Sequence, residues 1–268
     1  MTESPLRFAR LSGVDLAYLD EGAGPGIVLV HGLGTSAEIW RLLRGELAQH
    51  DRVIAVDLRA SGRTRERRRR ELTLDVLAGD LQELAAALAL SGAVVVGHSL
   101  GASVALKWAL EGPADISSLV LLGADANLAS LGPRMLASAA AIEELGLARW
   151  LDERWSQNPP FSAASLERIP NEYASYRELV LANDPGDYVR TCRAIAAAED
   201  LSGRLAEVEQ RAIVVAGAED DRTLPEHCRE LARLLPHARL VELPGVGHTI
   251  PLEAPYETLE AVLSVLPG

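Results

Sequence analysis

The chain has 268 residues, of which 48% are hydrophobic and 4% aromatic, which excludes wholesale disorder and indicates a core built mainly from Ala, Leu and Val. Its net charge of −12 argues against nucleic acid and anionic membranes as partners, because the field of the whole molecule would repel them. Cys192 and Cys228 lie far apart, which fits neither a disulfide scaffold nor a structural zinc site. No run has the apolar length of a signal peptide or a membrane span, so we expect a cytoplasmic protein.

In chain order, the predicted elements begin with a hairpin made of RFARL and VDLAYLDEG and continue as short apolar runs that alternate with helical patterns. The apolar runs lack polar alternation, which is typical of strands covered on both faces of a parallel sheet. They lie at residues 26–32, 52–58, 93–98, 118–125, 212–219 and 238–243. The main helical patterns lie at residues 36–50, 73–90, 225–235 and 254–266. This order predicts a doubly wound α/β fold with a mostly parallel, eight-stranded sheet flanked by helices.

One basic run, RTRERRRRE at residues 63–71, stands out against the acidic composition. It could form a phosphate-binding patch or a solvated loop between a strand and a helix. No aromatic residues interleave with the arginines, as they do in surfaces that stack on bases, and this favours the loop.

The alternation of strands and helices breaks once, from about residue 127 to residue 209, where only helical segments occur. An all-helical insertion after the sixth strand of a parallel sheet predicts a lid over the carboxyl edge of the sheet, where open α/β folds bind ligands. We therefore predict a core domain of residues 1–125 and 210–268 and a helical cap of residues 126–209.

The motif GHSLG joins the apolar run VVV to the helical pattern ALKWAL. A sharp turn from strand to helix crowds the residue at its apex, and Gly97 and Gly101 on either side of Ser99 relieve that crowding. The hydroxyl of Ser99 is then presented beside the N-terminus of a helix. In this strand–turn–helix context the motif predicts a nucleophilic serine.

A serine hydroxyl needs a base to take its proton and an acid to orient that base, and in this kind of fold both follow on later loops. His248 lies in the loop PGVGHTIPLE after the last predicted strand, and it is the candidate base. The segment EDDRTLP follows the preceding strand and offers three candidate acids, Glu219, Asp220 and Asp221.

The amide of Leu100, in the first turn of the helix after Ser99, is a candidate donor to an oxyanion. The second candidate is the amide of Leu33 in HGLGTS, where Gly32 and Gly34 let the backbone approach a reacting carbonyl closely. His31 and His98 flank the site, and we expect them to support it, whereas we expect His50, His227 and His237 to be exposed. No HxH or HExxH spacing occurs, so neither a metal nor a cofactor is implied.

With these residues the chain resembles the α/β-hydrolase fold superfamily over essentially its whole length, and Ser99, Asp220 and His248 fall on that family's triad positions. VDLRASGRT resembles the family's D-x-R-G-x-G-x-S segment, with Ala60 and Thr64 in place of a glycine and the serine. The lid segment ANDPGDYVRTCRAIAAAEDLSGRL and the following VVAGAEDDRTLPEHCRELA are most similar to 3-oxoadipate enol-lactonase-like proteins, while GHSLG has the esterase-like form. The resemblance favours Asp220 as the acid. Asp221, in the register of haloperoxidase-like relatives, and Asp125, after the preceding strand, stay open as alternatives.

The resemblance implies a serine hydrolase that cleaves a carboxylic ester or lactone of a small molecule through an acyl-enzyme. Hydrolysis of carbon–carbon bonds, cofactor-free perhydrolase or haloperoxidase chemistry and a weakly catalytic ligand receptor are the alternatives. Gly32, His98, Trp150 and Trp155 are candidate substrate contacts, and a homo-oligomer stays open. A substrate carboxylate would need a cation in the lid, and the candidates are Arg134, Arg149, Arg154, Arg190 and Arg193.

Overall fold

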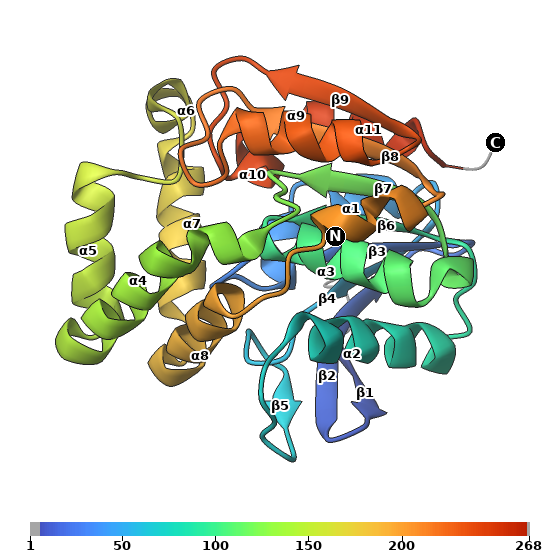
Figure 1. Ribbon diagram of the computed structural model, residues 1–268, viewed down its shortest axis with the longest axis horizontal. Coiled ribbons are helices and arrows are strands. Elements are labelled where there is room, and N and C mark those ends of the chain that lie inside the picture. Colours follow the sequence, from blue (N-terminus) through green and yellow to red (C-terminus); the bar gives the residue numbers. More distant parts are fainter. Residues whose placement is uncertain (1–5, 267–268) are drawn as a thin grey trace.

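The computed structural model describes residues 6–266 as a twisted sheet with helices packed against it (Figure 1). The main path of the sheet runs β1-β2-β4-β3-β6-β7-β8-β9, and the short β5 pairs with β2 at its side. Strands β1, β2 and β4 pair antiparallel, and all pairs from β4 onward are parallel. The strands are β1 Leu6–Leu11, β2 Val14–Glu21, β3 Gly26–Val30, β4 Arg52–Val56, β5 Arg65–Glu66, β6 Ala93–His98, β7 Ile116–Leu122, β8 Arg211–Gly217 and β9 Ala238–Leu243.

Helices flank the sheet: α3 packs on β3, β6 and β7, α9 packs on β8 and β9, and α1 packs on β4. The helices are α1 Arg44–Leu47, α2 Leu74–Ala87, α3 Leu100–Glu111, α4 Gly132–Leu145, α5 Leu147–Gln157, α6 Ala163–Arg168, α7 Pro170–Leu181, α8 Pro185–Ala196, α9 Pro225–Leu234, α10 Ile250–Glu253 and α11 Pro255–Leu263. Among residues 6–266, no helix combines the length and apolarity that crossing a membrane requires.

The central strands β3 and β6 are buried at every residue, which explains their unbroken apolar sequences, because both faces of the sheet are covered there. After β3 the chain moves to β4 on one side, and after the following helix it returns to β6 on the other side of β3. This reversal of strand order places the loops after β3 and β6 side by side at the carboxyl edge of the sheet, where doubly wound folds open a crevice.

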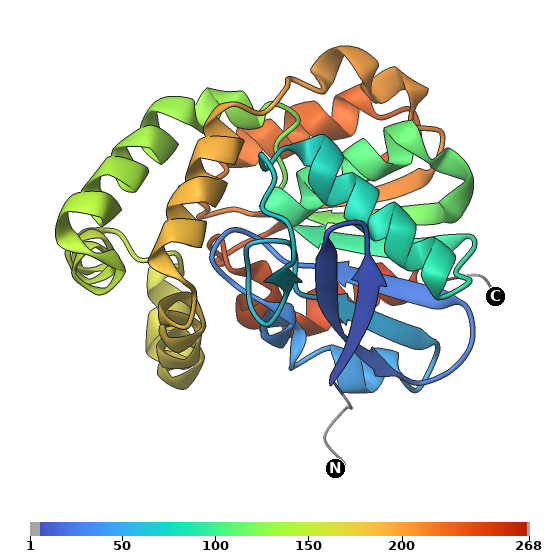
Figure 2. The same cartoon turned by 90° about the horizontal axis from the view of Figure 1, so that it is seen from below.

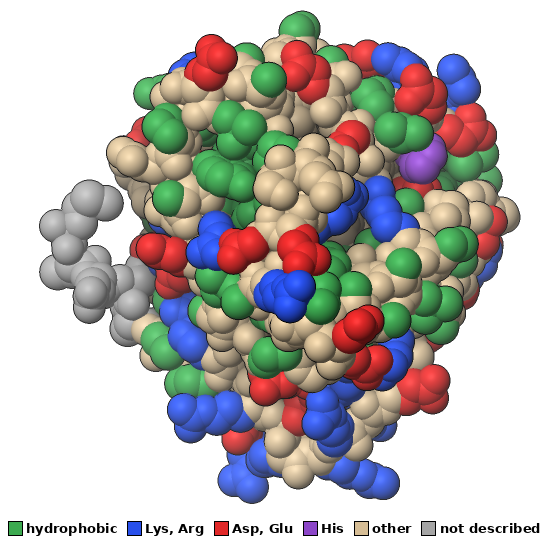
Figure 3. All heavy atoms as spheres, turned by 90° about the vertical axis from the view of Figure 1, so that its left-hand side faces the viewer, with side chains coloured by type: hydrophobic (Ala, Val, Ile, Leu, Met, Phe, Trp, Pro, Cys, Tyr) green, Lys and Arg blue, Asp and Glu red, His purple; other side chains and the backbone are tan. Residues whose placement is uncertain are grey.

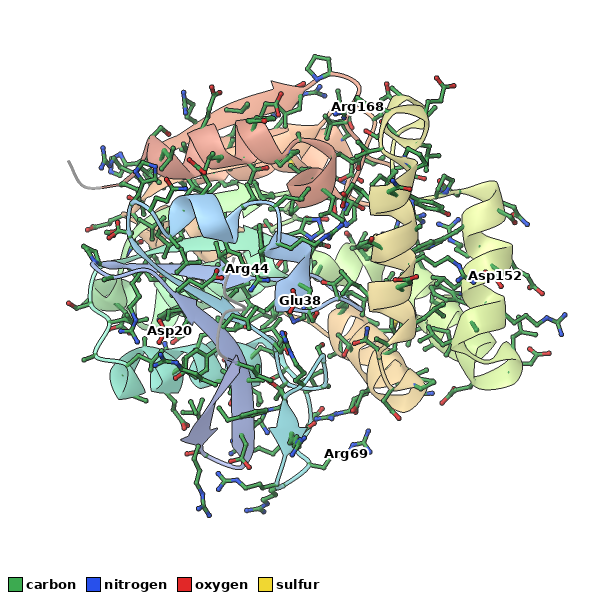
Figure 4. The ribbon with its side chains drawn as sticks, turned by 180° about the vertical axis from the view of Figure 1, so that it is seen from behind. Asp20, Glu38, Arg44, Arg69, Asp152 and Arg168 are labelled. Atoms are coloured by element: carbon green, nitrogen blue, oxygen red, sulfur yellow. The ribbon has the colours of Figure 1, made fainter. Side chains whose placement is uncertain are left out.

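Helices α4 to α8 form the insertion between β7 and β8 and lie beside the sheet, on the left of Figures 1 and 2. The turns between these helices contain residues that favour the start of a helix. Ser162 and Asp184 accept backbone hydrogen bonds as the N-caps of α6 and α8, and Pro170 and Pro185 are the first residues of α7 and α8. Arg168 on α6, labelled in Figure 4, donates to the carbonyl of Glu253 over 2.7 Å and ties the insertion to the last part of the chain.

The eight-stranded, mostly parallel path with a helical insertion after its sixth strand is confirmed, as is the N-terminal hairpin. Element ends differ from the prediction. The strand expected at 118–125 ends at Leu122, because Gly123 takes a φ of 54° and turns the chain out of the sheet. The helix expected at 36–50 is broken into the 3-10 turn Ala37–Trp40 and the four-residue α1, which contains Gly45. The division of domains at residues 126 and 209 stays a prediction.

The basic run at residues 63–71 is mostly a loop, with β5 inside it. Three of its six arginines pair with carboxylates, among them Arg67 with Asp15 over 3.3 Å, and the other three are exposed. Arg63 pairs with Asp57 over 2.8 Å, and Arg69 (labelled in Figure 4) pairs with Asp187 over 2.8 Å. Just before this run, Ala60 stands in the left-handed region with a φ of 62°, at the position where the family segment has a glycine.

Candidate active site

Ser99 stands at the junction of β6 and α3 with φ 52° and ψ −120°, a left-handed φ that side chains rarely adopt. The two flanking glycines are required by contact. A Cβ atom on Gly97 would lie 2.5 Å from the Cα of Ala102, and one on Gly101 would overlap the carbonyl oxygen of Val30 on β3. The chain can therefore make this turn only with hydrogen atoms at both positions, and the turn holds the Ser99 hydroxyl at the edge of the sheet.

Three side chains from separate loops meet at this turn. The Nε2 of His248, in the loop between β9 and α10, lies 3.1 Å from the Oγ of Ser99. The Nδ1 of the same ring lies 2.8 Å from the Oδ2 of Asp220, in the loop after β8. Because Asp220 as a carboxylate accepts, Nδ1 carries the hydrogen and Nε2 is left free to accept the proton of Ser99.

Of the candidate acids, only Asp220 reaches His248. It is 3% exposed, and its Oδ1 accepts the amides of Arg222 over 2.7 Å and Thr223 over 2.9 Å, which aims Oδ2 at the histidine. Glu219 and Asp221 are exposed. Asp125 turns away and pairs with His227 over 2.8 Å.

The electrostatics of this group keep the acid ionised. Burial alone would raise the pKa of Asp220, but the adjacent His248 and the two amide donors outweigh burial and hold that pKa below its ordinary value. Burial raises the pKa of both cysteine thiols, Cys192 and Cys228, to about 12, so neither is a thiolate nucleophile.

The loop that carries His248 is held by Glu253, a residue that the sequence did not single out. Its carboxylate is 1% exposed and accepts the amides of Gly247 over 2.8 Å and Thr249 over 2.9 Å, one on each side of His248. It also accepts the amide of Ser162 in the insertion over 2.9 Å. One buried acid therefore positions the histidine and the adjoining lid segment together.

The two flanking histidines are buried and neutral. The Nε2–H of His98 donates to the carbonyl of His248 over 2.9 Å, and burial, reinforced by His248, lowers the pKa of His98 to about 3. His31 donates from Nδ1 to the carbonyl of Gly32 and accepts the amide of Leu58 at Nε2, and burial lowers its pKa as well. Of the three histidines expected to be exposed, His50 and His237 are, whereas His227 is half-buried against Asp125.

Leu33 and Leu100, whose amides are the candidate oxyanion donors, both line the cavity above Ser99. Among residues 6–266, neither amide donates to another protein atom. Gly32 belongs to the same loop as Leu33, and a Cβ added to it would approach the Cβ of Ser99 to 3.1 Å. The loop is tied to the insertion, because Asn183 donates to the carbonyl of Gly34 over 2.8 Å.

The cavity has a volume of about 100 Å³ and lies between the turn at Ser99 and helices of the insertion. Of the candidate substrate contacts, His98, Trp150 and Trp155 line the cavity and Gly32 does not. Trp155 stacks on Tyr176 with ring centroids 5.4 Å apart, and Trp150 meets the edge of Tyr188 at 5.7 Å. The two tyrosines also line the cavity but were missed, because the sequences of α7 and α8 do not show which of their residues lie over Ser99.

Of the five candidate lid cations, Arg134 and Arg154 line the cavity. The other three pair with carboxylates: Arg149 with Glu153, Arg190 with Glu66 and Arg193 with Glu143. Arg222, two residues after Asp220, also lines the cavity and was missed. Among residues 6–266, no group of three or more His, Cys, Asp or Glu side chains is placed to hold a metal ion.

The fold agrees with the comparison to known families. The chain matches the alpha/beta hydrolase family over residues 27–262, and it belongs to that family. RutD of Variovorax paradoxus (strain S110) is 32% identical over 243 residues, which are 84% of this chain and 85% of that protein. Among solved structures, a hydrolase from Pseudomonas aeruginosa PA01 is 30% identical with a TM-score of 0.86, and the alignment covers 100% of both chains.

The enol-lactonase from Burkholderia xenovorans LB400 is 27% identical with a TM-score of 0.88, over 96% of this chain and 98% of that one. Other curated relatives are longer. Uncharacterized proteins of Mycobacterium tuberculosis and Mycobacterium bovis are 33% identical over 119 residues, which are 44% of this chain, and the match spans only 35% of their length.

Proposed function

We propose that this protein is a serine hydrolase that cleaves a carboxylic ester or lactone of a small molecule through an acyl-enzyme intermediate. The observation that carries the proposal is the series Ser99–His248–Asp220, joined at 3.1 and 2.8 Å beneath a cavity. The likeness to an enol-lactonase supports lactones among the substrates.

In the first half of the reaction, His248 takes the proton of Ser99 at Nε2 while the oxygen of Ser99 attacks the substrate carbonyl. Asp220, held by two backbone amides, keeps the hydrogen on Nδ1 and stabilises the positive charge that the ring gains. The protonated His248 then gives its proton to the leaving alkoxide.

The negative charge that develops on the carbonyl oxygen is stabilised by the amides of Leu33 and Leu100, which have no other protein acceptor among residues 6–266. Water then attacks the acyl-enzyme with His248 as base again. When the substrate is a lactone, the leaving hydroxyl stays attached to the acyl group, so hydrolysis must be faster than re-closure of the ring.

The test is the hydrolysis of p-nitrophenyl acetate by Ser99→Ala, with Ser103→Ala as matched control. Ser103 lies in the first turn of α3, just after Ser99, and donates to the carbonyl of Asp125, outside the triad. Ser99→Ala removes the nucleophile, and we expect turnover to fall by about a thousandfold or more. Ser103→Ala should retain most of it. Equal turnover in Ser99→Ala and the wild type, with both folded by circular dichroism, would refute the proposal.

The substrate range follows from the cavity. A volume of about 100 Å³ favours short acyl groups. A series of p-nitrophenyl esters and of lactones and enol lactones of rising chain length should show the highest kcat/KM at the short end. A steady rise of kcat/KM toward long chains would contradict a small acyl pocket.

A further inference from the structure

Three arginines line the cavity above Ser99. Arg134 comes from α4, Arg154 from α5 and Arg222 from the loop after β8, and all three line the cavity. The rest of the lining is largely apolar and aromatic. Figure 3 views the molecule from the side of the lid helices and shows Lys or Arg side chains at a hollow in this face. We call Arg134, Arg154 and Arg222 the arginine cluster.

The arginine cluster is short of negative charge. Arg134 donates to two neutral carbonyl oxygens, those of Asp221 and Arg222, and Arg222 donates to the carbonyl of Asn158. The nearest carboxylate partner is the exposed Asp221, whose Oδ1 lies 3.6 Å from the Nε of Arg222. Asp220 also lies nearby, but its two oxygens are engaged by His248 and two amides.

Arg154 is the least satisfied member. Among residues 6–266, its side chain has no hydrogen bond and no ion pair. Two other arginines of the insertion differ: Arg177 pairs with Asp152 (labelled in Figure 4), and Arg149 pairs with Glu153 over 2.8 Å.

The environment of the arginine cluster lowers the pKa of two of its members. Burial, together with the positive neighbour Arg154, lowers the pKa of Arg134. Burial also lowers the pKa of Arg222, with both other members of the cluster adding to the effect. Partly buried positive charge without a matching carboxylate is unfavourable, and a bound anion would stabilise it. The shortage of carboxylates at this site is notable because the chain as a whole has a net charge of −12.

We propose that the arginine cluster binds a carboxylate carried by the substrate, so that the preferred substrate is a small ester or lactone with a second, ionised carboxyl group. This inference rests on the proposed function, and it adds the substrate class. Arg154 makes the principal contact, because its planar guanidinium is free to bind the two oxygens of a carboxylate side by side. The carboxylate takes no part in bond breaking; it orients the reacting carbonyl over Ser99.

The experiment compares two esters with the same leaving group and acyl length, mono-p-nitrophenyl glutarate and p-nitrophenyl pentanoate. The wild type should prefer the glutarate in kcat/KM by about tenfold or more, a factor typical of one hydrogen-bonded charge pair. Arg154→Gln should lower the glutarate-to-pentanoate ratio by about 10- to 100-fold, and Arg154→Lys should restore part of it. The matched control Arg149→Gln lies on the same helix and should leave both rates unchanged.

The outcomes separate the two proposals. A wild type that hydrolyses both esters equally, or a ratio that Arg154→Gln leaves unchanged, overturns the carboxylate site and leaves the hydrolase intact. If neither ester is cleaved, the proposed function fails, and calorimetry then tests the site by itself. Glutarate should bind the wild type more tightly than Arg154→Gln, and equal or absent binding overturns the inference.

Discussion

At the scale of single residues, His98 shows how burial and hydrogen bonding fix the state of a side chain beside the reacting groups. The ring is 1% exposed, and its Nε2–H is committed to the carbonyl of His248. Its Nδ1 is buried and has no hydrogen-bond partner among residues 6–266. In a charged ring Nδ1 would also carry a proton, and that proton would be buried without an acceptor. His98 therefore stays neutral while the protein is folded.

Because His98 stays neutral in the folded protein, the free energy of unfolding should fall at low pH. The pKa of His98 is about 3 in the folded protein, below the value near 6.5 of an unfolded chain, so below pH 6.5 the unfolded state binds the extra proton and stability falls. Between pH 7.5 and pH 5 the wild type should lose about 2 kcal/mol more free energy of unfolding than His98→Gln, as measured by urea denaturation. His31 is present in both proteins and cancels. Equal losses in the two proteins would show that His98 does not resist protonation.

At the scale of elements, the contact of α3 with β3 fixes the position of Ser99. Gly101 lies in the first turn of α3 against the carbonyls of Val30 and His31, whereas Gly79, in the middle of α2, has open space where a Cβ would go. The same substitution at the two positions should therefore have opposite effects.

Gly79→Ala should stabilise the protein by about 0.5–1 kcal/mol, because alanine loses less backbone entropy in a helix. Gly101→Ala should destabilise it by about 2 kcal/mol or more and abolish ester hydrolysis, because α3 must move away from the sheet. Thermal and urea unfolding of the two variants provide the measurement. A fully active Gly101→Ala variant would mean that the close approach of α3 to β3 is not needed to place Ser99.

Much of the element pattern was predictable, because completely buried strands such as β3 and β6 have unbroken apolar sequences that few other structures tolerate. The ends were less predictable, since they depend on backbone turns such as that at Gly123. Ser99 and His248 could be singled out from local sequence. The sequence could not decide between Asp220 and Asp221, because a turn stabilised by the amides of Arg222 and Thr223 determines which carboxylate faces inward. Arg222 and Glu253 gave no local signal, since their roles arise from distant contacts.

At the scale of the whole molecule, the single lysine of the chain, Lys107, joins separate parts. Its side chain is 6% exposed on α3, and its Nζ lies 2.9 Å from Asp75 on α2 and 2.6 Å from Glu199 after α8. The insertion is also tied to the core by Asn183 at Gly34 and by Arg168 at Glu253. These links predict that the insertion and the sheet unfold together.

A lysine-specific protease can test this, because its only cleavage site lies inside α3 and becomes accessible on unfolding. Cleavage after Lys107 during brief proteolysis at rising urea should show one midpoint. Tryptophan fluorescence should share it, because Trp150 and Trp155 report on α5 while Trp40 and Trp108 report on the core. A fluorescence transition well before cleavage begins would mean that the lid unfolds on its own.

The account as a whole depends on the reactivity of one hydroxyl group, and covalent labelling measures this most directly. Diethyl p-nitrophenyl phosphate should transfer one diethylphosphoryl group per chain to Ser99, with release of p-nitrophenol, and mass spectrometry of the digested protein should locate the group there. His248→Ala should slow labelling by about a thousandfold, and Ser99→Ala should abolish it. Labelling that proceeds at the wild-type rate in Ser99→Ala, or no labelling of the folded wild type, would contradict the account.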